Sequence, residues 1–390
     1  MRWILLTLSL VAALVSLLTV VRAPDYMWAW KLAIVAGEYG HWLVLLPLGL
    51  AGAACLGPAG WSRGVTLILC VLATTGFLRP VFNAWRLAPA IPPAMQVALG
   101  GARASCTLDF PRLYRGAGVP DAVMETETFA RPEGEELKLD FYRPGRAKDV
   151  LEKPRPCVVV IHGGGWDDGD RTQLAAWNSR LVAQGYAVAA ISYRLAPRWI
   201  WPAQRDDVRA AIAWLKAHAA RLGIDPAQLV LLGRSAGGQL ATAVGYGAND
   251  PAIRGVIALY APHDMPFAWS VSREDDALNS VKLFRQYFGG APDTPERRAL
   301  YEAASGQLLA RPDSPPTLLI HGVPDTLAWV RHSQRLSARL EALRVPHYYL
   351  ELPWATHGFD FNPDGPGGQL ADAAIARFLA TVFVSPEHGI

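Results

Sequence analysis

Short apolar runs of four or five residues recur along the second half of the chain, with helical patterns between them. These runs are residues 157–161, 187–191, 229–232, 256–259 and 317–320. Apolar positions at helical spacing fill residues 174–184, 206–222 and 235–246. Strands that are apolar on both faces and alternate with helices predict a mostly parallel sheet with helices on both faces, which is a three-layer α/β domain.

Two further patterns frame this domain. Residues 125–129 and 137–142 alternate between polar and apolar with period two, which predicts an antiparallel strand pair at its start. A strand at 348–352 and a helix from about 368 to 382 follow the parallel strands. We expect the domain to cover residues 123–384. Residues 87–122 are rich in Pro and Gly, and we expect them to form a linker with little regular structure.

The chain before residue 87 is its most apolar part. Residues 3–21, 39–56 and 64–78 form uncharged apolar spans, and the first has nineteen residues, close to the length that crosses a bilayer. Tryptophans near the ends of the spans are typical of membrane interfaces: Trp28, Trp30, Trp42, Trp61 and Trp85. We therefore predict a membrane segment over residues 1–86 with two or three transmembrane helices.

The first apolar span has a second interpretation as a cleaved signal peptide. The stretch Val21-Arg-Ala-Pro is a poor cleavage site, which favours an uncleaved anchor. With three spans, Arg2 and Arg63 lie on one side of the membrane, and the remaining nearby positive charges lie with the domain: Arg22, Lys31, Arg79 and Arg86. This count favours a cytoplasmic domain, whereas a signal-like first helix favours export. The predicted location is a bacterial cell membrane, and both orientations stay open.

Composition narrows the possible partners. A net charge of +3 without Lys/Arg runs argues against a nucleic-acid partner. The four cysteines form no Cys-x-x-Cys pair and no Cys/His cluster, so we expect no metal site. A disulfide between Cys106 and Cys157 stays open. No cofactor motif stands out, and we expect none to be needed.

A Gly-x-Ser-x-Gly sequence lies where the 229–232 strand turns into the 235–246 helix. A serine at so sharp a corner is held in a strained conformation that lifts its hydroxyl clear of the sheet. Gly233 and Gly237 lack the Cβ atoms that would collide in such a turn. The pattern predicts that Ser235 is the nucleophile of a serine hydrolase, with the amide of Ala236 facing a developing oxyanion.

Three glycines follow the first buried strand, in the sequence His162-Gly-Gly-Gly-Trp166. Such a run lets backbone amides approach a ligand closely, and we expect Gly164 and Gly165 to complete the oxyanion hole. A flexible turn or a phosphate cradle is the alternative, but no Gly-Lys-Ser/Thr follows. His162 precedes the nucleophile, so we expect a structural imidazole there.

The remaining members of a catalytic triad follow in the order Ser, Asp, His. Asp325 lies on the loop after the 317–320 strand and His357 on the loop after the last strand, which predicts the acid and the base. Asp313 and Asp360 are the rival acids. The first precedes a strand, and the second lies too close to His357 in the sequence.

Together these motifs resemble the α/β-hydrolase carboxylesterases. The resemblance rests on the two glycine motifs, on Tyr193-Arg-Leu-Ala-Pro, on His-Gly-x-x-Asp325 and on His357-Gly-Phe. It covers roughly residues 123–384 and leaves the membrane segment outside. The chain is similar to the hormone-sensitive-lipase-type esterases and to the feruloyl/acetyl esterase-like enzymes, with kynurenine formamidase and prenylcysteine methylesterase as relatives. Arg234 and Trp166 replace the usual Asp and Phe of the lipase-type branch, which favours the feruloyl and formamidase side.

We therefore expect a membrane-anchored serine carboxylesterase that acts on short-to-medium acyl or aryl esters, or on a lipid-like ester, through an acyl-enzyme. An amidase, a peptidase or a formamidase-like hydrolase is the alternative within enzymes, and a non-catalytic membrane module is the alternative outside them. Residues 262–304 carry several aromatic side chains. They form either a lid over the acyl pocket or an excursion that packs on the core.

Overall fold

The computed structural model describes residues 1–101, 105–144 and 154–383. Its centre is an eight-stranded sheet in the order β1-β2-β4-β3-β5-β6-β7-β8. The strands are β1 (Ala122–Ala130), β2 (Leu137–Pro144), β3 (Arg155–Ile161), β4 (Ala187–Ile191), β5 (Ile224–Arg234), β6 (Ile253–Leu259), β7 (Thr317–Gly322) and β8 (His347–Leu352). β1 and β2 form the expected antiparallel pair and join the sheet through β4, while β3 to β8 are parallel to one another. Cys106 and Cys157 form no disulfide.

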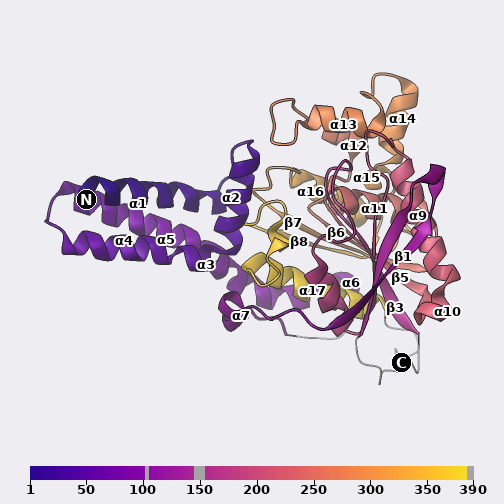
Figure 1. Ribbon diagram of the computed structural model, residues 1–390, viewed down its shortest axis with the longest axis horizontal. Coiled ribbons are helices and arrows are strands. Elements are labelled where there is room, and N and C mark those ends of the chain that lie inside the picture. The colour runs from indigo at the N-terminus through magenta and orange to yellow at the C-terminus, as the bar shows by residue number, and fades with distance from the viewer. Residues whose placement is uncertain (102–104, 145–153, 384–390) are drawn as a thin grey trace.

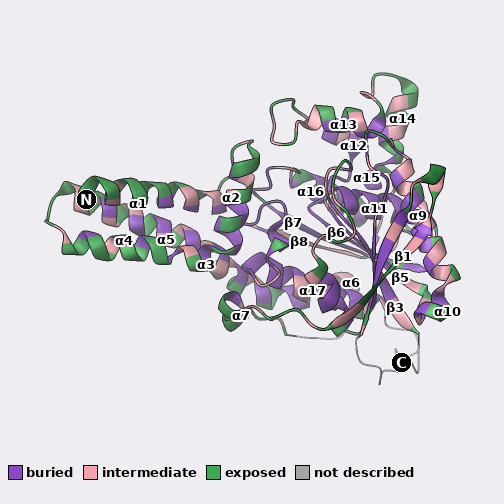
Figure 2. Cartoon of the chain, viewed as in Figure 1, coloured by how far each residue is buried: buried purple, intermediate pink, exposed green. Residues whose placement is uncertain are grey.

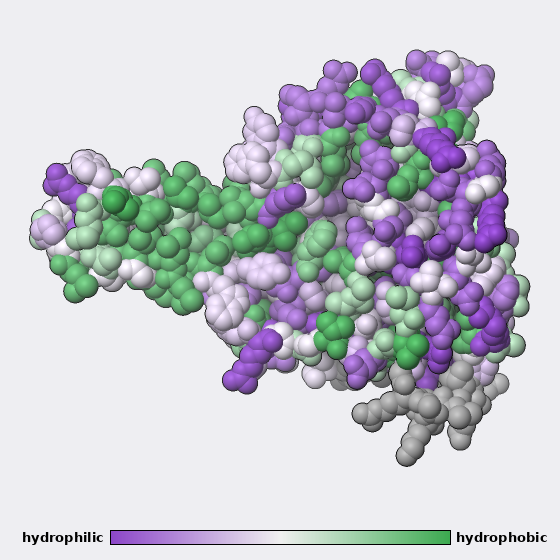
Figure 3. Space-filling model, in the orientation of Figure 1, coloured by the Kyte–Doolittle hydropathy of each residue, from purple (hydrophilic) through white to green (hydrophobic). Residues whose placement is uncertain are grey.

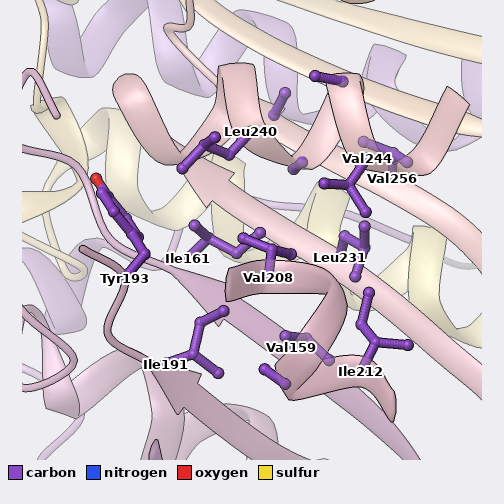
Figure 4. Packing of buried hydrophobic residues seen from close by; sticks show 14 of the residues in the cluster. Val159, Ile161, Ile191, Tyr193, Val208, Ile212, Leu231, Leu240, Val244 and Val256 are labelled. Carbon is purple, nitrogen blue, oxygen red and sulfur yellow. The ribbon is translucent and has the colours of Figure 1, made fainter. Parts of the chain in front are cut away.

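Helices cover both faces of the sheet (Figure 1). They are α8 (Ala175–Ala183), α9 (Ala203–Ala217), α10 (Ala219–Leu222), α11 (Ala236–Gly247), α12 (Met265–Ser270), α13 (Ser280–Phe288), α14 (Pro295–Ala303), α15 (Gly306–Leu309), α16 (Arg331–Ala342) and α17 (Pro366–Val382). Successive strand residues point to opposite faces, so Val159 packs with α9 and α11, whereas Val158 and Val160 pack with α8 and α17. Figure 4 shows part of the first of these two cores. The predicted three-layer α/β architecture is confirmed.

The N-terminal helices form a bundle that projects from this domain (Figure 1). They are α1 (Arg2–Ser16), which continues as a 3-10 turn (Leu17–Thr19), α2 (Met27–Glu38), α3 (Gly40–Leu43), α4 (Leu45–Leu56) and α5 (Trp61–Leu87). Much of the bundle is exposed and apolar (Figures 2 and 3). Among the described residues, two helices are long and apolar enough to cross a membrane, Arg2–Thr19 and Trp61–Leu99. The α2 to α4 segment adds a third span only if its 80° bend lies within one span.

The structure corrects the expectation of an irregular linker at 87–122. This segment contains a 3-10 turn (Ala88–Ala90), α6 (Ile91–Leu99) and α7 (Phe110–Arg115). Ala88, Ile91 and Met95 are buried against the α17 side of the sheet. The prolines that suggested a linker lie in the first turns of these helices, where a missing N–H costs no hydrogen bond. The domain limits of 86, 123 and 384 stay predictions, and residue 384 lies outside the described residues.

Candidate functional site

The candidate residues lie on loops at the carboxyl ends of four parallel strands. Gly164 and Gly165 follow β3, Ser235 follows β5, Asp325 follows β7 and His357 follows β8. Because the carboxyl ends of parallel strands meet at one edge of a sheet, these loops converge there. The fold thus brings together residues that are up to 193 positions apart, counted from Gly164 to His357.

Ser235 stands at the corner between β5 and α11 with φ 53° and ψ −120°, a strained conformation for a residue with a side chain. A Cβ at Gly233 would lie 2.0 Å from the carbonyl oxygen of Gly237, and a Cβ at Gly237 would lie 2.1 Å from that of Ile161. Both glycines are therefore required by close approach of the backbone. The predicted geometry of the turn is present.

A chain of hydrogen bonds joins the three predicted triad residues. Oγ of Ser235 lies 2.8 Å from Nε2 of His357, and Nδ1 of the same ring lies 2.8 Å from Oδ2 of Asp325. An Nδ1–H that donates to the carboxylate leaves Nε2 free to accept the serine proton. The arrangement has the geometry for general-base activation of Ser235.

The Asp325 carboxylate is fully buried and has partners on both oxygens. The amides of Leu327 and Ala328 each donate a 2.8 Å hydrogen bond to Oδ1, and Nε2 of His321 lies 3.2 Å from Oδ2. Burial opposes ionisation, but the charge of His357 and hydrogen bonds from His321 and His357 outweigh it, so the pKa of Asp325 lies below its ordinary value. The Asp325 carboxylate is therefore ionised at any pH at which the His357 imidazole can accept a proton.

The rival acids have other partners. Oδ2 of Asp360 accepts a 2.5 Å hydrogen bond from Nε of Arg234, and its Oδ1 accepts one from the Tyr260 hydroxyl. Asp313 forms a surface ion pair with Arg311. Within the described residues neither carboxylate is hydrogen-bonded to the His357 ring, whereas Tyr260 packs against that ring at a centroid distance of 4.5 Å.

The glycine loop after β3 has the shape expected of an amide donor loop. Gly164 and Gly165 adopt φ values of 118° and 61°, and within the described residues the amides of both, like that of Ala236, have no assigned acceptor. Ala236 is the first residue of α11, so its N–H has no partner inside the helix. Amides without an internal acceptor are the kind of donor that an oxyanion hole requires.

Side chains around the loop hold it in place. The His162 ring stacks on Tyr193 at 4.2 Å, and burial lowers the pKa of His162 to about 4, so this imidazole is neutral at pH 7. Trp166 stacks on Tyr287 at 4.3 Å, and both side chains donate hydrogen bonds to Gln239 on α11. The sequence analysis did not identify Gln239, because a single glutamine on a helix carries no recognisable pattern.

The 262–304 insertion packs on the core and also forms one wall of the site. Tyr287, Phe288 and Tyr301 are fully buried in the main core, while Leu283 and Phe284 line a cavity of about 760 Å³ that contains Ser235 and His357. The segment therefore combines the two alternatives from the sequence analysis, because part of it packs on the core and part of it borders the pocket.

The opposite wall comes from the N-terminal segment, which the sequence analysis assigned only to the membrane. Arg22, Asp25, Met27 and Trp30 line the same cavity. The indole N–H of Trp30 donates a 2.8 Å hydrogen bond to the carbonyl oxygen of His357. Tryptophan at the end of an apolar span is typical of membrane interfaces, so no sequence pattern distinguishes this residue from the other tryptophans.

Comparison with known proteins agrees with this architecture. The model of the BD-FAE family matches residues 139–340. Esterase LipC of Mycobacterium tuberculosis is 34% identical over 251 residues, which cover 61% of this chain and 61% of LipC. The alignment thus spans about three fifths of that relative. The probable carboxylic ester hydrolase LipM of the same organism is 26% identical over 93% of this chain and 88% of LipM, so that alignment extends into the N-terminal helices. Among solved structures, a bacterial heroin esterase has a TM-score of 0.60 at 21% identity, over 77% of this chain and 93% of that one.

Proposed function

Because the chain belongs to the BD-FAE family, whose model covers more than half of it, we propose that it is a membrane-anchored serine carboxylesterase. The observation that carries the proposal is the hydrogen-bonded series from Ser235 through His357 to Asp325, of which Ser235 and His357 line the cavity. The names of the relatives LipC and LipM, which are an esterase and a probable carboxylic ester hydrolase, support ester bonds as the target.

The proposed reaction proceeds through an acyl-enzyme. Oγ of Ser235 attacks the ester carbonyl carbon while Nε2 of His357 takes the hydroxyl proton. Asp325 holds the imidazole in the tautomer that accepts this proton and stabilises the imidazolium that forms. The amides of Gly164, Gly165 and Ala236 donate hydrogen bonds to the oxyanion of the tetrahedral intermediate.

The intermediate then collapses. His357 returns the proton to the leaving alkoxide, so that an alcohol departs and the acyl group stays on Ser235. Water enters, gives a proton to His357 and attacks the acyl carbon, and the second tetrahedral intermediate releases the carboxylic acid while His357 returns the proton to Oγ of Ser235. The cavity volume of about 760 Å³ falls within the range of about 300–1,000 Å³ that is usual for small-ligand sites. It can accommodate short-to-medium acyl or aryl esters.

The apolar helices supply the proposed anchor. Arg2–Thr19 and Trp61–Leu99 have the length and composition of membrane spans, and many apolar side chains of α1 and α5 are exposed around the bundle. In a bilayer, lipid hydrocarbon chains would cover these apolar side chains and remove them from water.

Hydrolysis of p-nitrophenyl butyrate by the detergent-solubilised full chain tests the proposal. We expect turnover by the wild type, loss of turnover in Ser235→Ala, and a much lower rate on the matching p-nitroanilide. Turnover that survives in Ser235→Ala would contradict the mechanism, and a faster rate on the anilide would favour an amidase.

A further inference from the structure

The catalytic cavity has one wall from each of two distant parts of the chain. Residues 22–30, which lead from the first apolar span into the first turn of α2, and residues 271–284 of the insertion both contribute to the cavity lining. An ion pair of 3.1 Å between Asp25 and Arg273 joins these two walls. The membrane-proximal segment and the insertion therefore meet at the border of the cavity.

The polar ends of both candidate spans contact the catalytic loops. The apolar run of α1 continues to Val21, and the next residue, Arg22, donates a hydrogen bond to the carbonyl of Thr326, the neighbour of Asp325. On α5 the first basic residue after the apolar run is Arg79, which donates to the carbonyls of Thr19 and Pro353. Arginines at the ends of spans mark the boundary between hydrocarbon and headgroups. This boundary therefore coincides with the mouth of the cavity.

The cavity lining includes exposed apolar side chains as well as charged ones. Met27, Val271, Leu278 and Phe361 line the cavity and are each more than a third exposed. Exposed apolar residues around the opening of a catalytic cavity are the feature expected of a site that accepts an apolar ligand. The exposed rings of Tyr26 and Trp28, on either side of Met27 in the sequence, stack with their centroids 6.0 Å apart. Tyrosine and tryptophan side chains are suited to the headgroup region of a membrane.

The charges of the cavity disfavour an anionic ligand. The guanidinium groups that line it already have protein partners: Arg22 donates to a backbone carbonyl, Arg234 pairs with Asp360, and Arg273 pairs with Asp25 and Asp275. Further carboxylates line the same cavity: Asp167, Asp168 and Asp276. Arg22 is the lining guanidinium without a carboxylate partner among the described residues, so a phosphate headgroup would meet more carboxylates than unpaired cations, whereas an uncharged ester would meet no such repulsion.

The geometry points to an uncharged, bilayer-resident fatty-acyl ester as the substrate, which enters directly from the membrane surface between residues 22–30 and 271–284. This inference rests on the proposed esterase activity of Ser235 and deepens it. The apolar chain passes Met27 and Phe361, while the ester group reaches Ser235 without crossing bulk water.

The test uses the full chain reconstituted in phosphatidylcholine vesicles that contain 1,2-dioleoylglycerol, with p-nitrophenyl acetate as a soluble reference ester. We expect Ser235-dependent release of oleate from the vesicles, and no release of fatty acid from the phosphatidylcholine itself. Hydrolysis of the acetate but not of dioleoylglycerol would overturn the inference and leave the proposed function standing. Hydrolysis of neither ester would overturn the proposed function.

Two adjacent substitutions on α2 test the entry route. Met27→Glu places a charge in the cavity mouth at an exposed position, and we expect the ratio of dioleoylglycerol to acetate hydrolysis to fall about tenfold, because the apolar chain would have to displace water from a carboxylate. Trp28→Glu makes the matched change at a residue that is 65% exposed and does not line the cavity. It should keep the wild-type ratio. An equal fall in both variants would mean that the charge acts at the membrane surface in general, and the entry route would be wrong.

Discussion

The indole N–H of Trp30, on a helix near the start of the chain, donates a 2.8 Å hydrogen bond to the backbone carbonyl of His357, 327 residues further on. The two rings also meet edge to face, with their centroids 6.5 Å apart. The loop that carries the proposed base is therefore fixed from one side by the segment that leads out of the apolar helices. The N-terminal region is part of the structure of the site.

Replacement of Trp30 tests this relationship. Trp30→Phe keeps an aromatic ring but removes the N–H donor, so the His357 loop loses a hydrogen bond worth about 1 kcal/mol, and we expect kcat to fall about fivefold with little change in KM. Trp28→Phe, at an exposed position on the same helix, is the control and should match the wild type. Unchanged kcat in Trp30→Phe would show that the hydrogen bond does not position His357.

The proposed nucleophile and base should behave as a unit. Ser235→Ala and His357→Ala are each expected to lower kcat by several orders of magnitude, and the double variant should be little worse than either, because one reaction step needs both groups. Steady-state kinetics on p-nitrophenyl butyrate measure the three rates. Additive losses in the double variant would contradict the proposed proton transfer between the two side chains.

Asparagine substitutions at the two buried aspartates, Asp325 and Asp360, should have clearly different effects on kcat. Asp325→Asn removes the acceptor of the His357 Nδ1–H, and we expect kcat to fall by roughly two to four powers of ten while the fold is retained. Asp360→Asn weakens the buried ion pair with Arg234, so we expect a lower unfolding temperature and only a small change in kcat. If Asp325→Asn were close to wild type and Asp360→Asn inactive, the assignment of the acid would be wrong.

Burial of His162 predicts how stability depends on pH. The folded state holds the pKa of this imidazole at about 4, below its ordinary value of 6.5, because burial disfavours the charged form. Between these values the unfolded chain binds a proton that the folded chain does not. The contribution of the His162 imidazole to the free energy of unfolding therefore falls as the pH drops from 6.5 to 4, by up to about 1.4 kcal/mol per pH unit.

Thermal unfolding of the wild type and of His162→Phe over this range measures the effect. Phenylalanine keeps a flat ring over Tyr193 and cannot be protonated, so the unfolding temperature of the variant should decline less steeply with acid. Parallel curves for the two proteins would show that His162 is not held neutral.

Much of the fold followed from local patterns. The buried strands β3 to β7 contain continuous apolar runs, and such runs between helical patterns have few other interpretations. The positions of Ser235, Asp325 and His357 on loops after β5, β7 and β8 were predictable for the same reason. The strand periodicity fixes where each loop begins, and the order of the three residue types narrows the choice.

The contribution of the N-terminal segment was not predictable in this way. Trp30 and Met27 have the same local surroundings as residues at a membrane interface, and only the three-dimensional fold brings them to the cavity. The prolines near residue 90 suggested a linker because proline usually ends a helix, yet in α6 it starts one. The contacts of Met27 and Trp30 with the cavity were missed because these residues are far from the catalytic residues in the sequence. The helix α6 was missed because proline occurs both at helix starts and in linkers.

A truncated chain tests whether the catalytic domain is independent of these helices. Deletion of residues 1–90 removes Glu38, whose carboxylate accepts hydrogen bonds from Gly367 at the start of α17 and from Trp354. It also removes Ala84 and Ala88 from the core. We expect the unfolding temperature to fall by about 10 °C or more, since losses of several kcal/mol are involved. A truncated domain as stable and active as the full chain would support the linker interpretation instead.

The most direct measurement for the account is covalent labelling with a fluorophosphonate, which phosphonylates only an activated serine. Intact mass and peptide mapping of the full chain should show one adduct per protein on Ser235, with activity lost in proportion to labelling. His357→Ala should label far more slowly, because Nε2 of His357 is the base that activates the hydroxyl. A chain that resists labelling, or that is labelled elsewhere while Ser235 stays free, would contradict the proposed mechanism.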